Sequence, residues 1–197
     1  MKLTTLPVGA MQCNAYILQA DNGDAVVVDP GDEALRIMHA LETQAAHLTA
    51  IWLTHGHFDH IGAVNELAEK YACPVIAGAE ETAVLHDGNL NLSLPFLGVP
   101  MTVTPTKVYR DNDTFTFAGE TVTVLHTAGH TMGGVCYHIG NFLFSGDTMF
   151  AGSYGRTDFP TGDFATLMRS LSRLKTLPPK TVVLAGHGPA TTIRNEI

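Results

Sequence analysis

The stretch Thr54-His55-Gly56-His57-Phe58-Asp59-His60 decides the fold, because it places three histidines and one aspartate within six residues. It directly follows Ala50-Ile51-Trp52-Leu53, an apolar run that favours a β-strand. A strand that ends in such a loop can direct several ligands into one small volume. Imidazole suits zinc and iron, and a carboxylate completes such a site. Because packing these polar groups together without a cation is costly, the stretch predicts a metal site.

Three more metal-binding side chains follow predicted strands further along the chain. His130 comes after the run 121–125, Asp147 closes the run 142–146, and His187 follows the run 182–184. Each therefore lies at the carboxyl end of a strand, where loops collect and sites are built. Together with the first stretch they supply enough ligands for two metal ions that share one carboxylate.

In this order the motifs resemble the metallo-β-lactamase superfamily, and within it the compact bacterial glyoxalase II-like hydrolases. The resemblance extends from Asp29-Pro30-Gly31 to His187. It implies two divalent ions and a division of the ligands between them. The first ion is expected at His55, His57 and His130, the second at Asp59, His60 and His187, with Asp147 bridging both.

The local geometry of the first stretch agrees with this division. His55 and His57 point the same way in an extended segment, so one ion can take both. Asp59 and His60 lie where the chain has to turn into a helix expected to begin near Ile61. Zinc is the favoured metal, although the same ligands accept iron or manganese.

Composition predicts one globular domain over residues 1–197 and excludes several partners. The chain is 45% hydrophobic and carries 11 basic against 19 acidic side chains, for a formal charge of −8. Without a Lys/Arg cluster, nucleic-acid binding is disfavoured. No apolar run reaches the roughly 18–20 residues of a transmembrane helix, and residues 1–7 do not resemble a signal peptide. Three widely spaced cysteines suit a reducing cytoplasm.

Hydrophobic periodicity predicts an α/β (α+β) chain with two strand-rich blocks. Strands are expected at 14–18 and 24–29 around a turn, at 74–77, and in the clusters 107–126 and 134–146. A helix capped by Asp32 is expected to bury Leu35, Ile37, Met38 and Leu41, and another, capped by Asp163, to bury Phe164, Leu167, Met168, Leu171 and Leu174. Two such halves with outer helices imply a four-layer αββα sandwich, which the family resemblance also predicts.

The predicted chemistry is hydrolysis by a metal-bound hydroxide. Bound metal lowers the pKa of water from ~15.7 to ~7, and two ions can hold the resulting hydroxide facing a carbonyl carbon. Asp59 and Asp147 are the expected catalytic carboxylates, Asp59 as a ligand that can also orient the hydroxide. A thiolate leaves without a general acid, because its thiol pKa is only ~8.5. The substrate is therefore expected to be a thioester, and the resemblance implies S-2-hydroxyacylglutathione.

The loop Gly152-Ser153-Tyr154-Gly155-Arg156-Thr157-Asp158-Phe159 is similar to a G-R-[ST]-D-F segment of those compact hydrolases. Arg156 is expected to bind a substrate carboxylate, since a guanidinium binds carboxylates through two hydrogen bonds. The alternative is a salt bridge with Asp158 that braces the loop. No counterpart of the C-terminal helical domain with which larger glyoxalase II enzymes contact glutathione is expected in residues 1–197, which argues against tight selectivity for glutathione. The apolar segment 90–101 is expected to roof the site, to contact another subunit or to fold onto the core.

The strongest competing hypothesis is a persulfide dioxygenase, a family that also resembles this chain. Its single iron would be held by His55 or His57, by His130 and by Asp147. The intact second ligand set favours the hydrolase. A lactonase is a further alternative on the same fold. A β-lactamase is disfavoured because Asp147 occupies the bridging position, and a non-catalytic binding module leaves the full ligand set without a use.

Overall fold

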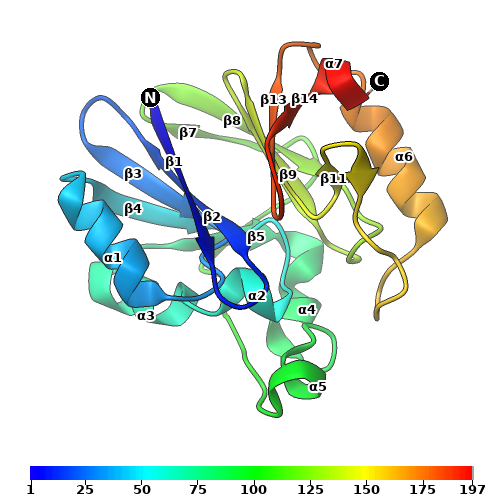
Figure 1. Cartoon of the computed structure of the whole chain (residues 1–197), viewed down its shortest axis with the longest axis horizontal. Helices are drawn as coiled ribbons and strands as arrows, with labels where there is room; N and C mark the ends of the chain where they lie inside the picture. Colours follow the sequence, from blue (N-terminus) through cyan, green and yellow to red (C-terminus); the bar gives the residue numbers. More distant parts are fainter. Residues whose placement is uncertain (197) are drawn as a thin grey trace.

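The computed structural model describes residues 1–196 and contains two six-stranded sheets that face each other (Figure 1). The first sheet follows the chain order β1 (Lys2–Val8), β2 (Cys13–Gln19), β3 (Asp24–Val28), β4 (His47–Trp52), β5 (Val75–Gly78) and β6 (Lys107–Tyr109). The second has the order β14 (Thr191–Thr192), β13 (Val182–Ala185), β10 (Phe142–Gly146), β9 (Val135–Ile139), β8 (Glu120–His126) and β7 (Thr114–Phe117). A short ribbon pairs β11 (Met149–Phe150) with β12 (Ser153–Tyr154).

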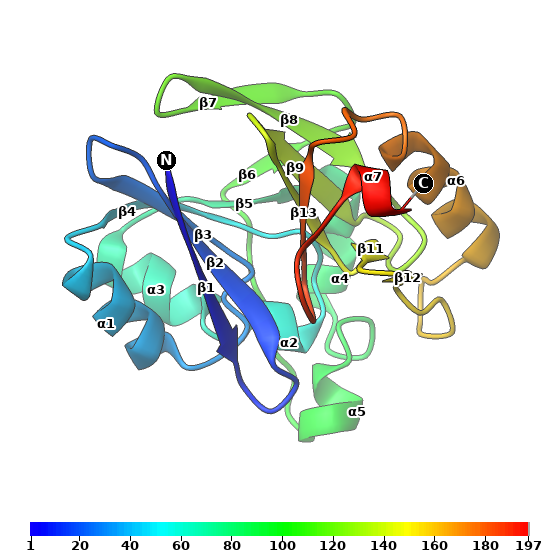
Figure 2. The same cartoon turned by 45° about the horizontal axis from the view of Figure 1, so that its top comes forward.

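Helices cover the outer face of each sheet. Figures 1 and 2 show α1 (Ala34–Thr43) and α3 (Val64–Tyr71) on one side of the molecule and α6 (Phe164–Leu174) on the other. Shorter helices lie in the connections: α2 (Phe58–Ile61), the 3₁₀ turn η1 (Ala79–Glu81), α4 (Thr82–His86) and α5 (Ser93–Leu97). A further short helix, α7 (Ile193–Glu196), follows the last strand. The predicted four-layer αββα sandwich is confirmed.

Alternation along the strands explains the layering. In β2, Ile17 packs into the hydrophobic core between the first sheet and the helices α1 and α3. Tyr16 and Leu18 pack into a second core that lies between the two sheets. Trp52 of β4 lies in that second core, with its ring centroid 6.3 Å from that of Phe144 in the opposite sheet. Because successive side chains of a strand face opposite ways, a strand buried on both faces joins two cores.

Strand direction brings the four predicted ligand-bearing loops to one edge. β4 is parallel to β3 and β5, and β10 is parallel to β13. β9 runs antiparallel to both β8 and β10, so β8 ends on the same edge as β10. The loops that follow β4, β8, β10 and β13 therefore meet where the two sheets open.

Three local predictions about helices were wrong. α2 begins at Phe58, three residues before the predicted start, so Asp59 and His60 already belong to a helical turn. Leu35 is 75% exposed because the buried stripe of α1 runs through Ala34, Ile37, Met38 and Leu41, about 100° around the helix from it. Phe164 is 54% exposed because it is the first residue of α6, before the buried stripe begins at Leu167. Asp32 does not cap α1, which begins after Glu33 in a left-handed conformation (φ +54°).

Other local predictions are confirmed. Asp163 caps α6 by accepting a hydrogen bond from the backbone N–H of Thr166 at 2.7 Å. The strand pair β2–β3 is antiparallel across the predicted turn, and β5 occupies the predicted position after Pro74.

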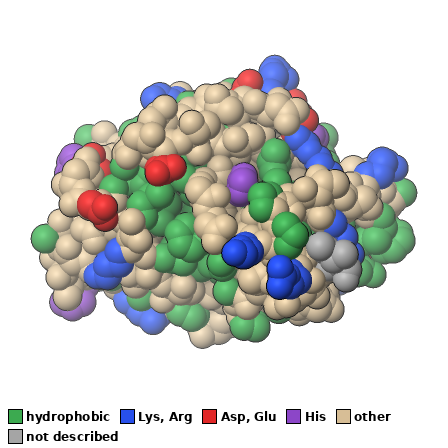
Figure 3. Space-filling view, turned by 90° about the horizontal axis from the view of Figure 1, so that it is seen from above, with side chains coloured by type: hydrophobic (Ala, Val, Ile, Leu, Met, Phe, Trp, Pro, Cys, Tyr) green, Lys and Arg blue, Asp and Glu red, His purple; other side chains and the backbone are tan. Residues whose placement is uncertain are grey.

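The surface and the helix lengths give two further observations. Within residues 1–196, no helix is both long enough and apolar enough to cross a bilayer. On the face seen in Figure 3, Lys and Arg side chains are dispersed among apolar and neutral atoms. This dispersion accords with the small number of basic side chains in the composition.

Candidate metal centre

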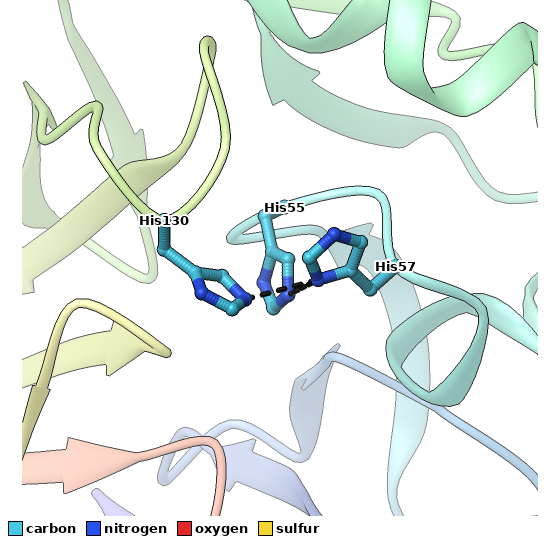
Figure 4. Close-up of side chains that lie close together, drawn as sticks. All are labelled: His55, His57 and His130. Atoms are coloured by element: carbon cyan, nitrogen blue, oxygen red, sulfur yellow. Dashed lines mark hydrogen bonds between the residues drawn. The ribbon is translucent and has the colours of Figure 1, made fainter. Parts of the chain in front are cut away.

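Three histidines from two loops converge on one point (Figure 4). His55 and His57 follow β4, and His130 follows β8. His57 Nδ1 lies 3.1 Å from His55 Nε2 and 2.9 Å from His130 Nε2. A ring nitrogen carries either one proton or one lone pair, so hydrogen bonds cannot satisfy all three atoms, whereas a cation accepts a lone pair from each.

Hydrogen bonds on the far side of two rings select the tautomer that a metal needs. His130 Nδ1 lies 2.8 Å from the carbonyl oxygen of Arg156, to which it can only donate. Thr54 donates its hydroxyl proton to Asp29 at 2.6 Å and can accept from His55 Nδ1 at 3.2 Å. Both arrangements leave the Nε2 lone pair directed at the common point, as in histidine ligands generally.

A second set consists of Asp59, His60 and His187. His187 Nε2 lies 3.3 Å and His60 Nε2 3.9 Å from the same oxygen of Asp59. His60 Nδ1 faces the carboxylate of Asp29 at 3.1 Å. The Nε2 atom of His60 is buried without a hydrogen-bond partner among the described residues. Such an unpartnered atom is costly unless a cation binds it.

Asp147 lies between the two sets. Its Oδ2 is 3.6 Å from His130 Nε2 in the first set and 3.7 Å from His187 Nε2 in the second. Its Oδ1 is 3.5 Å from His60 Nε2 and is also buried without a partner in the part of the chain that the structure describes. One carboxylate therefore faces both sets with a separate oxygen available for each.

The electrostatics of the two sets differ. Burial, reinforced by the neighbouring histidines, holds the pKa of His55 and His57 well below its usual range, so both rings are neutral and can act as ligands. Burial alone would lower the pKa of His60, but Cys13 and the carboxylates around it keep that pKa well above its usual value. A metal ion at the second set therefore has to displace a proton, which makes binding pH-dependent.

The donor chemistry fits two divalent ions. Imidazole nitrogens and carboxylate oxygens are ligands for zinc and iron, and two buried atoms without hydrogen-bond partners among the described residues, His60 Nε2 and Asp147 Oδ1, face each other at 3.5 Å. The structure brings together every residue that the sequence predicted as a ligand: His55, His57, Asp59, His60, His130, Asp147 and His187.

A cavity of about 450 Å³ adjoins both sets. Its wall is mainly apolar, and Phe96 of α5 stacks on Phe58 with ring centroids 5.4 Å apart. Segment 90–101 thus contributes to the site through α5 and Leu92, in line with the predicted roof. The lining comprises Met11, His57, Phe58, Asp59, Leu92, Phe96, His130, Asp147, Phe150, Ser153, Tyr154, Arg156, Phe159 and His187.

Arg156 lines this cavity but is already paired. Its Nε and Nη2 atoms donate to the two carboxylate oxygens of Asp158, each at 2.6 Å. The guanidinium also lies 3.9 Å from the ring centroid of Phe159. The side chain of Arg156 remains 56% exposed. The predicted salt bridge between Arg156 and Asp158 is therefore present. Because Arg156 also lines the cavity, its guanidinium is within reach of a ligand bound there.

Sequence reasoning missed one buried acid near the site. Glu81 is fully buried, and burial raises the pKa of its carboxyl to about 7 although three donors stabilise the charged form. In the sequence it stands beside Glu80 in a polar stretch typical of a surface helix. The only available signal was its position just after a predicted strand.

Comparison with known proteins places the chain in a family. The family model "Metallo-beta-lactamase superfamily" matches residues 8–187. The "Probable metallo-hydrolase YqgX" of Bacillus subtilis is 38% identical over 200 residues, covering 100% of this chain and 94% of the relative. The "Hydroxyacylglutathione hydrolase GloC" of Haemophilus influenzae is 34% identical over 203 residues, covering 100% of this chain and 95% of the relative.

Solved structures agree with this placement. The BLEG-1 B3 metallo-β-lactamase has a TM-score of 0.94 and 38% identity, with 99% of this chain and 96% of that chain covered. TTHA1623 in a di-iron-bound form has a TM-score of 0.85 and 36% identity, with 98% and 96% covered. ETHE1 from Myxococcus xanthus has a TM-score of 0.81 and 27% identity, with 100% and 81% covered. The sequence, the fold and the paired ligand sets together establish that this chain belongs to the metallo-β-lactamase superfamily.

Proposed function

We propose that this chain is a binuclear metallohydrolase of the glyoxalase II type, a thioesterase that cleaves S-2-hydroxyacylglutathione. The observation that carries the proposal is the position of Asp147, which faces histidines of both ligand sets at the wall of the cavity. The identity to the hydroxyacylglutathione hydrolase of Haemophilus influenzae supports the choice of substrate class.

In this proposal each residue of the centre has a defined role. His55, His57 and His130 hold the first ion, while Asp59, His60 and His187 hold the second. Two such ions supply a nucleophilic hydroxide at neutral pH and polarise the substrate carbonyl. Asp147 fixes the spacing of the two sets, and Asp29 holds the ring of His60 through Nδ1. Zinc suits the histidine-rich first set, while the di-iron form of TTHA1623 makes iron the alternative to test by metal analysis.

The cavity and the leaving group favour a thioester. A thiolate is stable enough to depart unprotonated, because an ordinary thiol has a pKa of ~8.5. Asp59, buried beside His60 and His187, has its pKa lowered by those rings and so stays ionised as a ligand. The apolar wall of Phe58, Phe96 and Phe159 excludes water from the bound acyl group.

The same proposal covers the extent of the domain, the cellular compartment and the partner of this chain. We propose that residues 1–197 act as one structural unit, since loops from both sheets complete one centre. The cysteines at 13, 73 and 136 are all buried as free thiols, which supports a reducing, cytoplasmic setting. The expected partner is the small-molecule thioester itself.

The proposal is tested by hydrolysis of S-D-lactoylglutathione with metal-loaded protein beside a chelator-treated sample. Turnover that the chelator abolishes and added zinc restores is the expected result. Two bound ions without turnover would contradict the proposed thioester substrate. Hydrolysis of a β-lactam and of a lactone would then be tested, since BLEG-1 is a B3 metallo-β-lactamase.

A persulfide dioxygenase is the second candidate, which the likeness to ETHE1 favours. It requires one iron at His55 or His57, His130 and Asp147, with the second set vacant. Oxygen consumption with glutathione persulfide, by protein that contains a single iron and no second ion, would replace the hydrolase by this oxidoreductase.

Arg156→Ala is expected to raise KM for the glutathione thioester by roughly three- to tenfold with kcat little changed, because it removes one exposed charge-assisted contact. Steady-state kinetics measure this, with Arg169→Ala on the outer helix α6 as the matched control. Asp158→Asn separates the two roles of Arg156. If Arg156 binds substrate, releasing it from Asp158 keeps or lowers KM; if Arg156 only braces the loop, both variants raise KM alike.

A further inference from the structure

The carboxylate of Glu81 connects two loops that come from opposite sheets. It belongs to η1, immediately after β5, and its side chain is fully buried. Oε1 accepts a hydrogen bond from the backbone N–H of Gly56 at 2.7 Å. Oε2 accepts from the hydroxyl of Thr131 and from the backbone N–H of Gly133, both at 2.9 Å.

Two of these contacts are next to a histidine of the first ligand set, and the third, Gly133, lies three residues after His130 in the same loop. Gly56 stands between His55 and His57, and Thr131 directly follows His130. His55 and His57 lie on one loop and His130 on the other, and the backbone N–H of Val135 in β9 also joins the two sheets here by donating to the carbonyl oxygen of Thr54 at 2.8 Å. One buried carboxylate thus ties both loops together at the backbone, a few bonds from the ligand atoms.

The packing leaves no freedom at this junction. A Cβ built on Gly133 would lie 2.1 Å from the backbone nitrogen of Glu81, so the loop after His130 rests directly on η1. A buried carboxylate is tolerated only when donors replace its water, and three donors do so here. Glutamine cannot substitute fully, because its amide nitrogen would face the N–H of either Gly56 or Gly133.

The second ligand set has a different support. Asn14 of β2 donates from Nδ2 to the carbonyl oxygens of Ala185 at 3.0 Å and Gly188 at 2.9 Å, on either side of His187. Its backbone N–H donates to the carbonyl oxygen of Gly186 at 2.7 Å. The contacts of Glu81, by contrast, are all to the loops of the first set.

We propose that Glu81 is a positioning residue that holds His55, His57 and His130 in ligand geometry, and so sets the metal affinity of the first set separately from the second. This inference rests on the proposed function only in assigning metal ions to the two sets. Groups that orient metal ligands typically contribute 10–100-fold to metal affinity, which is the scale expected here.

The test measures each set alone. In a His187→Ala background, zinc affinity of the first set is measured by competition with a chromophoric chelator, with and without Glu81→Gln. In a His57→Ala background, the zinc affinity of the second set is measured in the same way, again with and without Glu81→Gln. Glu81→Gln is expected to weaken zinc binding about 10- to 100-fold in the first background and less than threefold in the second.

Three further variants keep the result interpretable. Glu80→Gln changes the neighbouring exposed acid, which pairs with Arg110, and is expected to leave both affinities within threefold. Asn14→Ala is expected to have the opposite effect: it should lower the zinc affinity of the second set and leave that of the first set unchanged. Thr131→Val removes only one donor and should give a smaller loss of the same kind, should Glu81→Gln prevent folding as judged by circular dichroism.

Equal losses in both backgrounds, or a loss below threefold in the first, would overturn the assignment of Glu81. Because these titrations contain no substrate, a failure to hydrolyse S-D-lactoylglutathione would leave them intact. Conversely, unchanged zinc affinity with normal turnover would remove the positioning role and leave the proposed function standing.

Discussion

Asp147→Ala is expected to reduce hydrolysis by roughly 1,000-fold or more and to leave fewer than two ions bound per chain. Metal ions contribute several kcal/mol to such a transition state, and each ~1.4 kcal/mol is tenfold in rate. Asp147 faces both sets, with Oδ2 toward His130 and His187 and Oδ1 toward His60. Its removal takes a ligand from each ion at once.

Metal content by elemental analysis and kcat with S-D-lactoylglutathione measure this effect together. Asp158→Ala, an exposed acid at the edge of the same cavity, is the matched control and should keep both ions. Two ions and full turnover in Asp147→Ala would contradict the bridging role. A loss of turnover with both ions retained would move Asp147 from ligand to a role in substrate binding.

The ligand residues could be predicted from sequence because their signals are local. His55 and His57 alternate in an extended segment after an apolar strand, and His130, Asp147 and His187 each follow a strand-like run. Parallel strands in each sheet then place all of these ends at one edge. The local pattern and the topology therefore agree without any long-range information.

Glu81 and Asn14 show what such reasoning cannot reach. Each is a polar residue within an otherwise ordinary segment, and its partners lie more than 20 residues away along the chain or in the opposite sheet. Only the packed structure shows that both are buried. The exposure of Leu35 and Phe164 has a related cause, since helical periodicity gives the spacing of a stripe but neither its exact face, which in α1 includes Ala34 and not Leu35, nor the point along α6 where its contact begins.

Gly186→Ala is expected to abolish binding at the second set and to reduce turnover by at least about 100-fold while the fold is kept. A Cβ at this position would lie 2.2 Å from Asp147 Oδ1 and 2.6 Å from His60 Cε1. The side chains of Asp147 and His60 would therefore have to move, and neither could then keep the position in which it binds a metal ion. The backbone itself can accept alanine, because the φ of Gly186 lies outside the left-handed region in which side chains are strained.

Gly188→Ala in the same loop separates this steric effect from a general effect of the substitution. Gly188 has φ +75° and open space around its Cβ position, so alanine there costs about 1–2 kcal/mol of backbone strain without touching a ligand. It should lower Tm by several degrees and keep two ions with near-normal turnover. Zinc titration, Tm and kcat of both variants give the comparison. If Gly186→Ala binds two ions as tightly as Gly188→Ala does, the second set does not hold its metal between His60 and Asp147 as proposed.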